Sequence, residues 1–170
     1  MYTAYKGQEG PFAIRYPRGK GSCPEWRNNM EILPIGKGEL LQEGEKIAVL
    51  SIGAIATEVS KAIELLKEKG EVIPAHYDMV FLKPLDTTLL EYVATHYQAV
   101  ITVEDGAVHG GLGSSVLETL AEMGYQGRVK RLGIPDQFIP HGTPREQYSF
   151  SGIDAQSIAQ TILSLKEQLR

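Results

Sequence analysis

The sequence lacks long apolar runs and has a single cysteine. No apolar stretch approaches the roughly 18 residues that a membrane-spanning helix requires, and the N-terminal residues do not follow the pattern of a secretory signal peptide. Because Cys23 is the only cysteine, an internal disulfide is excluded, and a reducing compartment is the simplest environment for the chain. We therefore expect a cytoplasmic protein.

An excess of positive charge is also missing. The chain has 17 Lys and Arg against 21 Asp and Glu, which gives a formal net charge of -4. This balance argues against a nucleic-acid or acidic-membrane surface as the partner. With 170 residues, 42% of them hydrophobic, the chain is long enough for one domain with its own core and a short appendage.

Regular alternation of apolar segments begins near Lys46 and predicts a fold class. The pattern indicates strands at Ile47–Ile52, Val72–Val80, Ala99–Val103 and Val129–Leu132, and helices at Ala56–Lys69, after Asp86, after Gly113 and at Asp154–Leu169. Strands that alternate with helices favour a three-layer α/β/α domain, with a mostly parallel sheet of about five strands. Asp86 is the expected N-cap of its helix.

The N-terminal part has a different character. Residues 1–30 are rich in proline and glycine and contain one short strand-like run, Phe12–Tyr16, with no partner nearby in the sequence. Residues 32–44 read as a linker followed by a short hairpin-like piece. We expect residues 1–30 to be the end of an element whose main part is not in this sequence.

A glycine-rich loop, Gly106–Ser115, follows the third predicted strand. Its Gly111-x-Gly113 pair resembles a dinucleotide fingerprint, but Val116 occupies the third glycine position and no acidic residue ends the next strand. We therefore favour a contact surface, between domains or across a dimer, over a nucleotide site. A helix starting near Gly113 would offer its N–H groups to that partner. On this hypothesis Gly111→Val disturbs assembly more than folding.

Several polar residues have both a catalytic and a structural interpretation. Glu104 and Asp105 end a strand, where catalytic carboxylates are often found, but adjacent strand residues point in opposite directions, which favours loop and helix capping. His109 and His141 lie in loops at the carboxyl ends of strands and are expected to be solvated near one surface. No histidine pair has metal-ligand spacing, so no metal site is predicted.

Two arginines flank a proline in the segment Arg15-Tyr16-Pro17-Arg18. A guanidinium group suits a phosphate or a carboxylate, although an ordinary surface role is equally compatible with this pattern alone.

Five motifs occur in one order: AIRYPRG (13–19), LPIGKGE (33–39), FLKPLD (81–86), VEDGAVHGGLGSSV (103–116) and LGIPDQFIPHGT (132–143). Together they resemble the C-terminal part of the 1-deoxy-D-xylulose-5-phosphate synthase family, thiamine-diphosphate enzymes of the transketolase superfamily. The resemblance runs nearly end to end, including GIDAQSIAQTI (152–162). It departs at Val80, where relatives often have an arginine, and it gives His109 no family role.

The resemblance implies a domain organisation and a set of functional expectations. Residues 1–30 would be the end of a pyrimidine-binding transketolase-like domain, 31–45 a linker and 46–170 a transketolase C-terminal-like domain. The family condenses pyruvate with glyceraldehyde 3-phosphate, with loss of CO2, in non-mevalonate isoprenoid biosynthesis. Arg18 would bind the phosphate of glyceraldehyde 3-phosphate.

The resemblance also implies what the full-length enzyme needs and this chain lacks. Thiamine diphosphate and Mg would serve the full-length homodimer. The family's GDG…N motif and activating glutamate are not among these residues, so we expect no catalytic, cofactor-binding or metal-binding residue here and an inactive isolated chain. Two other hypotheses remain: a stand-alone dimerisation or interaction module, and a fragment of a transketolase or 2-oxo-acid dehydrogenase β subunit.

Overall fold

The structure is a computed structural model that describes residues 1–7, 10–16 and 29–169. It divides into two compact units, Met1–Ile35 and Gly36–Arg170. Arg18, the predicted phosphate-binding residue, and Cys23 lie outside the described residues. The assignment of residues 1–30 and 31–45 to a domain end and a linker stays a prediction.

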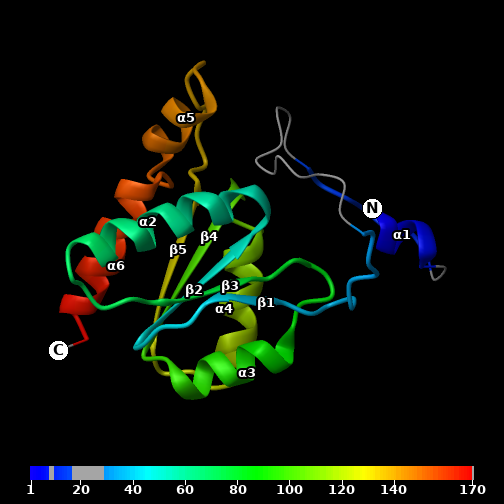
Figure 1. The fold of residues 1–170 in the computed structure, drawn as a ribbon, viewed down its shortest axis with the longest axis horizontal. Coiled ribbons are helices and arrows are strands. Elements are labelled where there is room, and N and C mark those ends of the chain that lie inside the picture. Colours follow the sequence, from blue (N-terminus) through cyan, green and yellow to red (C-terminus); the bar gives the residue numbers. More distant parts are fainter. Residues whose placement is uncertain (8–9, 17–28, 170) are drawn as a thin grey trace. The chain divides into compact units, whose positions relative to one another are not determined.

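The second unit is built on a five-stranded sheet in the order β1-β3-β2-β4-β5. Four strands are parallel, and the edge strand β1 runs antiparallel to β3. The strands are β1 Glu39–Gln42, β2 Ile47–Ile52, β3 Ala75–Asp78, β4 Ala99–Ala107 and β5 Arg128–Ile134. This arrangement confirms the predicted α/β class with a mostly parallel sheet (Figure 1).

Helices cover both faces of this sheet (Figure 1). Side chains of α2 and α6 pack on one face, and those of α3 and α4 pack on the other. The helices are α2 Ala56–Glu68, α3 Thr87–His96, α4 Leu112–Glu122, α5 Pro144–Ser151 and α6 Ala155–Glu167, with a 3-10 turn at Gly53–Ile55. The domain therefore has the expected three layers, with α5 as an addition outside them.

The apolar pattern of the sequence explains why these elements pack as they do. The first five residues of β2 are buried, because a central parallel strand is covered on both faces. In α2, Val59, Ala62, Ile63 and Leu66 recur at intervals of three and four residues, and all four are buried against the sheet. Asp86 caps α3 as predicted, since its side chain accepts the N–H of Leu89.

Some boundaries differ from the prediction. The segment after the linker is not a hairpin, because β1 pairs with the distant strand β3. Strand β3 is shorter than expected and begins at Ala75. The preceding residue, Pro74, has no N–H group to donate to a neighbouring strand. Strand β4 continues to Ala107, so Glu104, Asp105 and Gly106 belong to the strand rather than to a loop. Helix α5 was not predicted.

In the described part of the first unit, the chain forms one short helix, α1 Tyr2–Lys6. The buried Thr3 accepts the backbone N–H of Leu33 at 3.0 Å, which joins the two ends of this unit. The strand predicted at Phe12–Tyr16 is not formed, since no partner strand exists in the described part of this unit. Among the described residues, no helix is long and apolar enough to cross a membrane.

Candidate functional site

The carboxyl ends of the four parallel strands meet at one edge of the sheet. Functional contacts of parallel α/β sheets are formed at this edge. Here it carries the turn after β2, the segment Met79–Asp86 after β3, the turn Val108–Gly111 after β4 and the segment Pro135–Thr143 after β5. Most of the residues singled out in the sequence therefore belong to one region, the carboxyl edge.

Glu104 occupies the centre of this edge. Its side chain is buried, with 5% of its surface exposed, and its two carboxylate oxygens accept the backbone N–H groups of Leu112 and Gly113, both at 2.9 Å. These are two of the N–H groups that a helix leaves without a partner at its start, and an anion is favourable there. The capping interpretation of Glu104 is therefore confirmed.

The glycines beside Glu104 are required by close packing inside the domain. A Cβ at Gly111 would overlap the carboxylate of Glu104, and a Cβ at Gly113 would come within 2.6 Å of the Thr102 hydroxyl. A valine at Gly111 would therefore strain the fold of the domain itself; the expectation that it also disturbs assembly stays a prediction. The expectation that α4 offers its first N–H groups to an outside partner is wrong for Leu112 and Gly113, because Glu104 accepts both.

A second network fixes the turn that precedes α4. Arg131 on β5 donates to the carbonyl oxygen of Val108 at 3.1 Å and to the hydroxyl of Ser114 at 3.0 Å. That hydroxyl accepts the N–H of Gly110 at 2.8 Å. The turn is thus fixed at both ends, and His109 at its tip is exposed.

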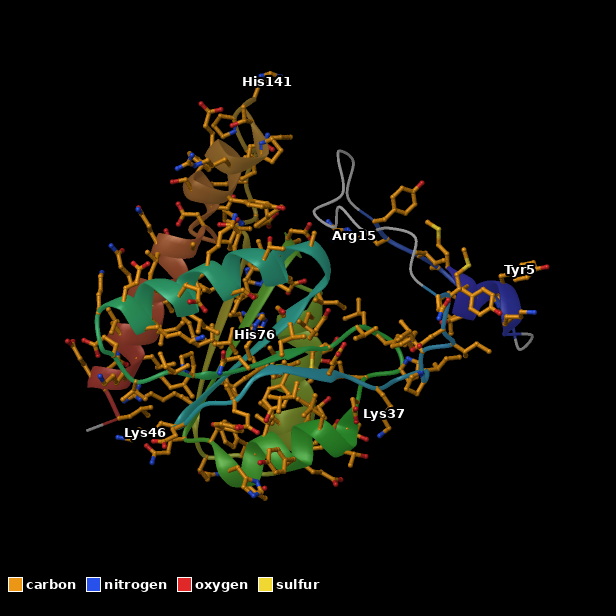
Figure 2. The ribbon with its side chains drawn as sticks, viewed as in Figure 1. Tyr5, Arg15, Lys37, Lys46, His76 and His141 are labelled. Carbon is orange, nitrogen blue, oxygen red and sulfur yellow. The ribbon has the colours of Figure 1, made fainter. Side chains whose placement is uncertain are left out.

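The other loop histidine, His141, is also exposed and lies in the segment before α5 (Figure 2). The exposure predicted for His109 and His141 is confirmed. Their closeness to one another stays a prediction.

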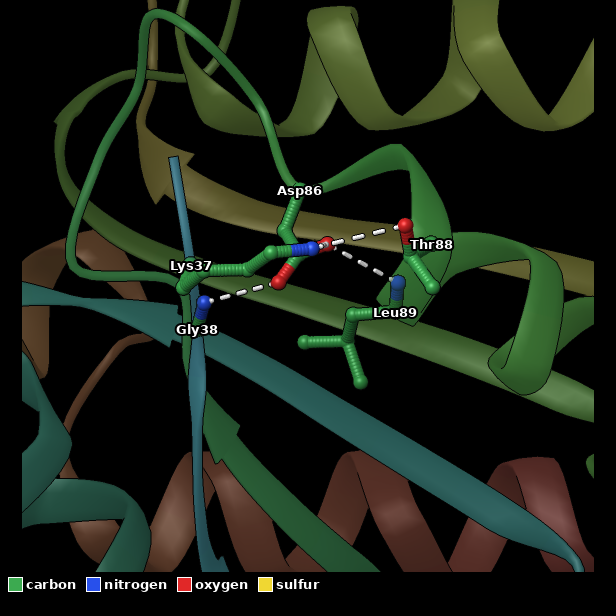
Figure 3. A network of polar contacts seen from close by, with 5 residues as sticks. All are labelled: Lys37, Gly38, Asp86, Thr88 and Leu89. Atoms are coloured by element: carbon green, nitrogen blue, oxygen red, sulfur yellow. Dashed lines mark hydrogen bonds and ion pairs between the residues drawn. The ribbon is translucent and has the colours of Figure 1, made fainter. Parts of the chain in front are cut away.

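A buried carboxylate also organises the segment before β1 (Figure 3). Asp86 accepts N–H groups from Gly38 and Leu89, each at 3.0 Å, and the ammonium of Lys37 at 3.2 Å. Lys37 also donates to the hydroxyl of Thr88 at 3.4 Å. Burial alone would raise the pKa of Asp86, but these donors hold it below its ordinary value. The ionised carboxylate therefore joins the entry to β1 with the start of α3.

The segment between β3 and α3 contains an unusual backbone position. Val80 has a φ of 54°, a left-handed conformation that β-branched residues rarely adopt. Its N–H donates to the side chain of Asp78 at 3.0 Å. Burial raises the pKa of Asp78, against the effect of the N–H groups of Val80 and Gly53. Val80 thus occupies a constrained turn between β3 and α3.

All four histidines lie among the described residues, and of these only His76 is buried. It lies on β3, facing the layer of α2 and α6, and its Nε2 is 2.8 Å from the hydroxyl of Ser51. Burial lowers the pKa of His76 to about 4, so the ring is neutral at pH 7. Its Nδ1 has no hydrogen-bond partner among the described residues.

The capping roles of Glu104 and Asp86 were predicted correctly from the sequence, but the roles of Arg131, Lys37 and Ser51 were missed. These three act through partners that lie 17 to 49 residues away in the sequence, and no local pattern indicates such pairs. Among the described residues, no group of three or more His, Cys, Asp or Glu side chains has the geometry of a metal site.

Comparison with known proteins identifies relatives over nearly the whole chain. The chain is 56% identical over 162 residues to 1-deoxy-D-xylulose-5-phosphate synthase of Parabacteroides distasonis, which covers 95% of this chain and 26% of that protein. It is 51% identical over 169 residues to the synthase of Porphyromonas gingivalis, with 99% and 26% covered. The chain thus spans about a quarter of the length of these curated relatives.

Solved structures with the same fold include a split-gene transketolase described as an inactive beta4 tetramer. It has a TM-score of 0.72 and 30% sequence identity, and the match covers 79% of this chain and 44% of that one. A transketolase from Campylobacter jejuni, at TM-score 0.55 and 17% identity over 76% of this chain and 18% of that one, shares the fold. The family of the transketolase C-terminal domain matches residues 36–158, and the chain belongs to that family.

Proposed function

We propose that this chain is the C-terminal part of a 1-deoxy-D-xylulose-5-phosphate synthase. The whole enzyme would condense pyruvate and glyceraldehyde 3-phosphate, release CO2 and form 1-deoxy-D-xylulose 5-phosphate for non-mevalonate isoprenoid biosynthesis. The observation that carries the proposal is the 56% identity with a synthase across 95% of the chain. We further propose a cytoplasmic homodimer as the working form.

Within such an enzyme, the second unit would serve as a preorganised docking domain. The caps at Glu104 and Asp86 and the contacts of Arg131 fix the backbone of the carboxyl edge from inside the domain. A loop that is already ordered loses little entropy when a partner binds it. These contacts support a role in positioning other regions of the enzyme.

Arg18 would supply the one direct contact with substrate. Its guanidinium would bind the phosphate of glyceraldehyde 3-phosphate through charge-assisted hydrogen bonds. This assignment comes from the family motif RYPRG, and Arg18 lies outside the described residues.

Thiamine diphosphate and Mg would be held elsewhere in the full-length enzyme. A site for the metal-diphosphate group needs carboxylate and carbonyl oxygens aimed at the cation. The two buried carboxylates at the carboxyl edge do not fit this requirement, because Glu104 and Asp86 already accept backbone N–H groups of α4 and α3. We therefore derive no catalytic step through the cofactor in this chain.

A chimeric enzyme tests the proposal. The corresponding C-terminal quarter of the Parabacteroides distasonis synthase is replaced by these 170 residues, and formation of 1-deoxy-D-xylulose 5-phosphate is measured. We expect activity within about tenfold of the parent enzyme, since the exchanged segment is 56% identical. A folded chimera that makes none of this product contradicts the proposal.

A second candidate is supported by the structural match with the split-gene transketolase, which covers 79% of this chain at a TM-score of 0.72. On that alternative, the chain would be a fragment of a transketolase β subunit. The same chimera separates the two candidates, because a transketolase segment would not support the condensation of pyruvate with glyceraldehyde 3-phosphate.

A further inference from the structure

One part of the second unit contributes to its core only through the partly buried ring of Tyr148. The segment after β5 and the helix that follows, Pro135–Ser151, are called here the arm. Helix α5 has no buried residue, and Phe138 is fully exposed, with a relative exposure of 103%. Figure 1 shows α5 projecting beyond the layer of α2 and α6. The arm is therefore an element that the domain itself leaves largely uncovered.

The arm is nevertheless ordered by its own polar contacts. Thr143 caps α5 through the N–H of Glu146, and the Glu146 carboxylate accepts the N–H of Thr143 at 2.8 Å, which completes a capping box. The side chain of Gln147 donates to the carbonyl of Pro140 at 3.3 Å. Gly152 ends the helix in the left-handed conformation. The shape of the arm is thus set before any partner binds.

Apart from the contact of Tyr148 with the core, α5 has no apolar packing within the domain. An isolated helix of eight residues is marginal in water, since most helical stability comes from packing of an apolar face. An aromatic ring that is fully exposed forgoes the burial that usually stabilises it. Large aromatic side chains on ordered surfaces are typical anchors of protein interfaces. The arm therefore has the properties of a docking element.

We propose that the arm docks on the region that precedes this chain in its relatives, with Phe138 inserted into an apolar pocket of that region. This inference rests on the proposed function. The relatives are about four times as long as this chain, so about three quarters of their length is available to cover the arm. The arm leaves β5 at the carboxyl edge, the same edge that bears the fixed turn Val108–Gly111, and docking there would continue one contact surface.

Hydrogen exchange in the chimeric enzyme tests this docking. The amides of Asp136–Ile139 are expected to exchange at least about tenfold more slowly in the chimera than in the 170-residue chain alone. The substitution Phe138→Ser should abolish this protection. Tyr92→Ser is the matched control, because Tyr92 is a half-exposed aromatic residue on α3, and it should leave the protection of the arm unchanged.

The outcomes separate the docking proposal from the proposed function. Protection of the arm in a chimera without synthase activity supports docking and contradicts the function. An active chimera whose arm exchanges as fast as in the isolated chain overturns docking and leaves the function intact. Protection that appears in the isolated chain as its concentration rises assigns the arm to a second copy and also overturns the proposal.

Discussion

Glu104 shows how one side chain can fix a loop and a helix together. Both of its oxygens accept N–H groups of α4, while its main chain belongs to β4, an interior strand between β2 and β5. Gly111 and Gly113 lack a Cβ at the positions where one would collide with this arrangement. A residue at the location of a catalytic carboxylate is thus fully engaged in structure.

The substitution Glu104→Gln is expected to destabilise the second unit. The amide keeps one oxygen for an N–H of α4 but places its NH2 group against the other donor. A lost charge-assisted hydrogen bond and an unsatisfied buried donor together cost about 2–4 kcal/mol of unfolding free energy. Urea denaturation measures the change. Glu122→Gln, at the exposed far end of α4, is the control and should stay within about 0.5 kcal/mol.

His76 is expected to make the stability of the domain depend on pH. Burial lowers its folded pKa to about 4, below the ordinary 6.5, so the unfolded chain takes up this proton first. Stability from this group is complete above pH 6.5 and falls as the pH drops toward 4, by about 3 kcal/mol in total. Chemical denaturation at pH 7, 5.5 and 4.5 measures the slope.

The variant His76→Gln provides the comparison for this pH dependence. Its unfolding free energy at pH 7 should be lower, but its decline between pH 6.5 and 4.5 should be shallower than in the parent chain. Equal slopes for the two proteins would show that His76 is not the source.

At the scale of secondary structure, prediction succeeded where the determining contacts are local. The bounds of strand β2 and helix α2 were predicted to within a residue. A continuous apolar run indicates a buried strand, and apolar residues at intervals of three and four indicate a helix, and both patterns are visible in the local sequence. The cap at Asp86 was found because an N-cap acts on the helix that directly follows it. Local chemistry and tertiary structure agree in these elements.

Prediction failed where the partner is distant or the segment is exposed. Strand β1 pairs with residues about 35 positions away, so its partner is not visible in the local pattern. Helix α5 packs on the core only through Tyr148 and has no fully buried residue, so it lacks an apolar periodicity to detect. Thr143, Pro144 and Glu146 nevertheless form a recognisable start signal. The segment Phe12–Tyr16 had residues suited to a strand, but it pairs with no strand among the described residues of its unit.

The variant Asp86→Ala tests the junction of β1 with α3. It removes the acceptor for Gly38, Leu89 and Lys37, and loss of a cap with two buried acceptor contacts should cost about 2–3 kcal/mol. In this variant, hydrogen exchange of the Glu39–Gln42 amides should be faster than in the parent chain, and this increase should exceed any increase in the amides of β4. Asp136→Ala, at an exposed position of the arm, is the control. Unchanged exchange in β1 would contradict this role.

At the scale of the whole molecule, the isolated chain is expected to be catalytically inactive and not to bind thiamine diphosphate. The cofactor needs a protein site that holds its diphosphate through Mg and positions its reactive ring, and the family motifs for these tasks are not among these residues. Calorimetric titration of the chain with thiamine diphosphate and Mg checks this. A micromolar Kd would contradict it.

In the chimeric enzyme, Arg18→Ala is expected to raise the KM for glyceraldehyde 3-phosphate more than the KM for pyruvate. A contact with a non-reacting phosphate stabilises the ground and transition states alike, and its loss should cost about 1.5–3 kcal/mol. Steady-state kinetics with each substrate varied in turn measures the effect. Arg15→Ala is the control, and equal damage to both substrates would indicate a structural role for Arg18.

The position of the Asp86 network along the chain has a mechanical consequence. Lys37 and Gly38 are fastened to Asp86 immediately before the edge strand β1 begins. Tension transmitted from the preceding residues therefore meets this anchor first, and the β1–β3 ladder bears no load until the anchor yields. The network therefore protects the edge strand β1, because forces transmitted by the preceding residues act on the Asp86 contacts before they act on the pairing of β1 with β3.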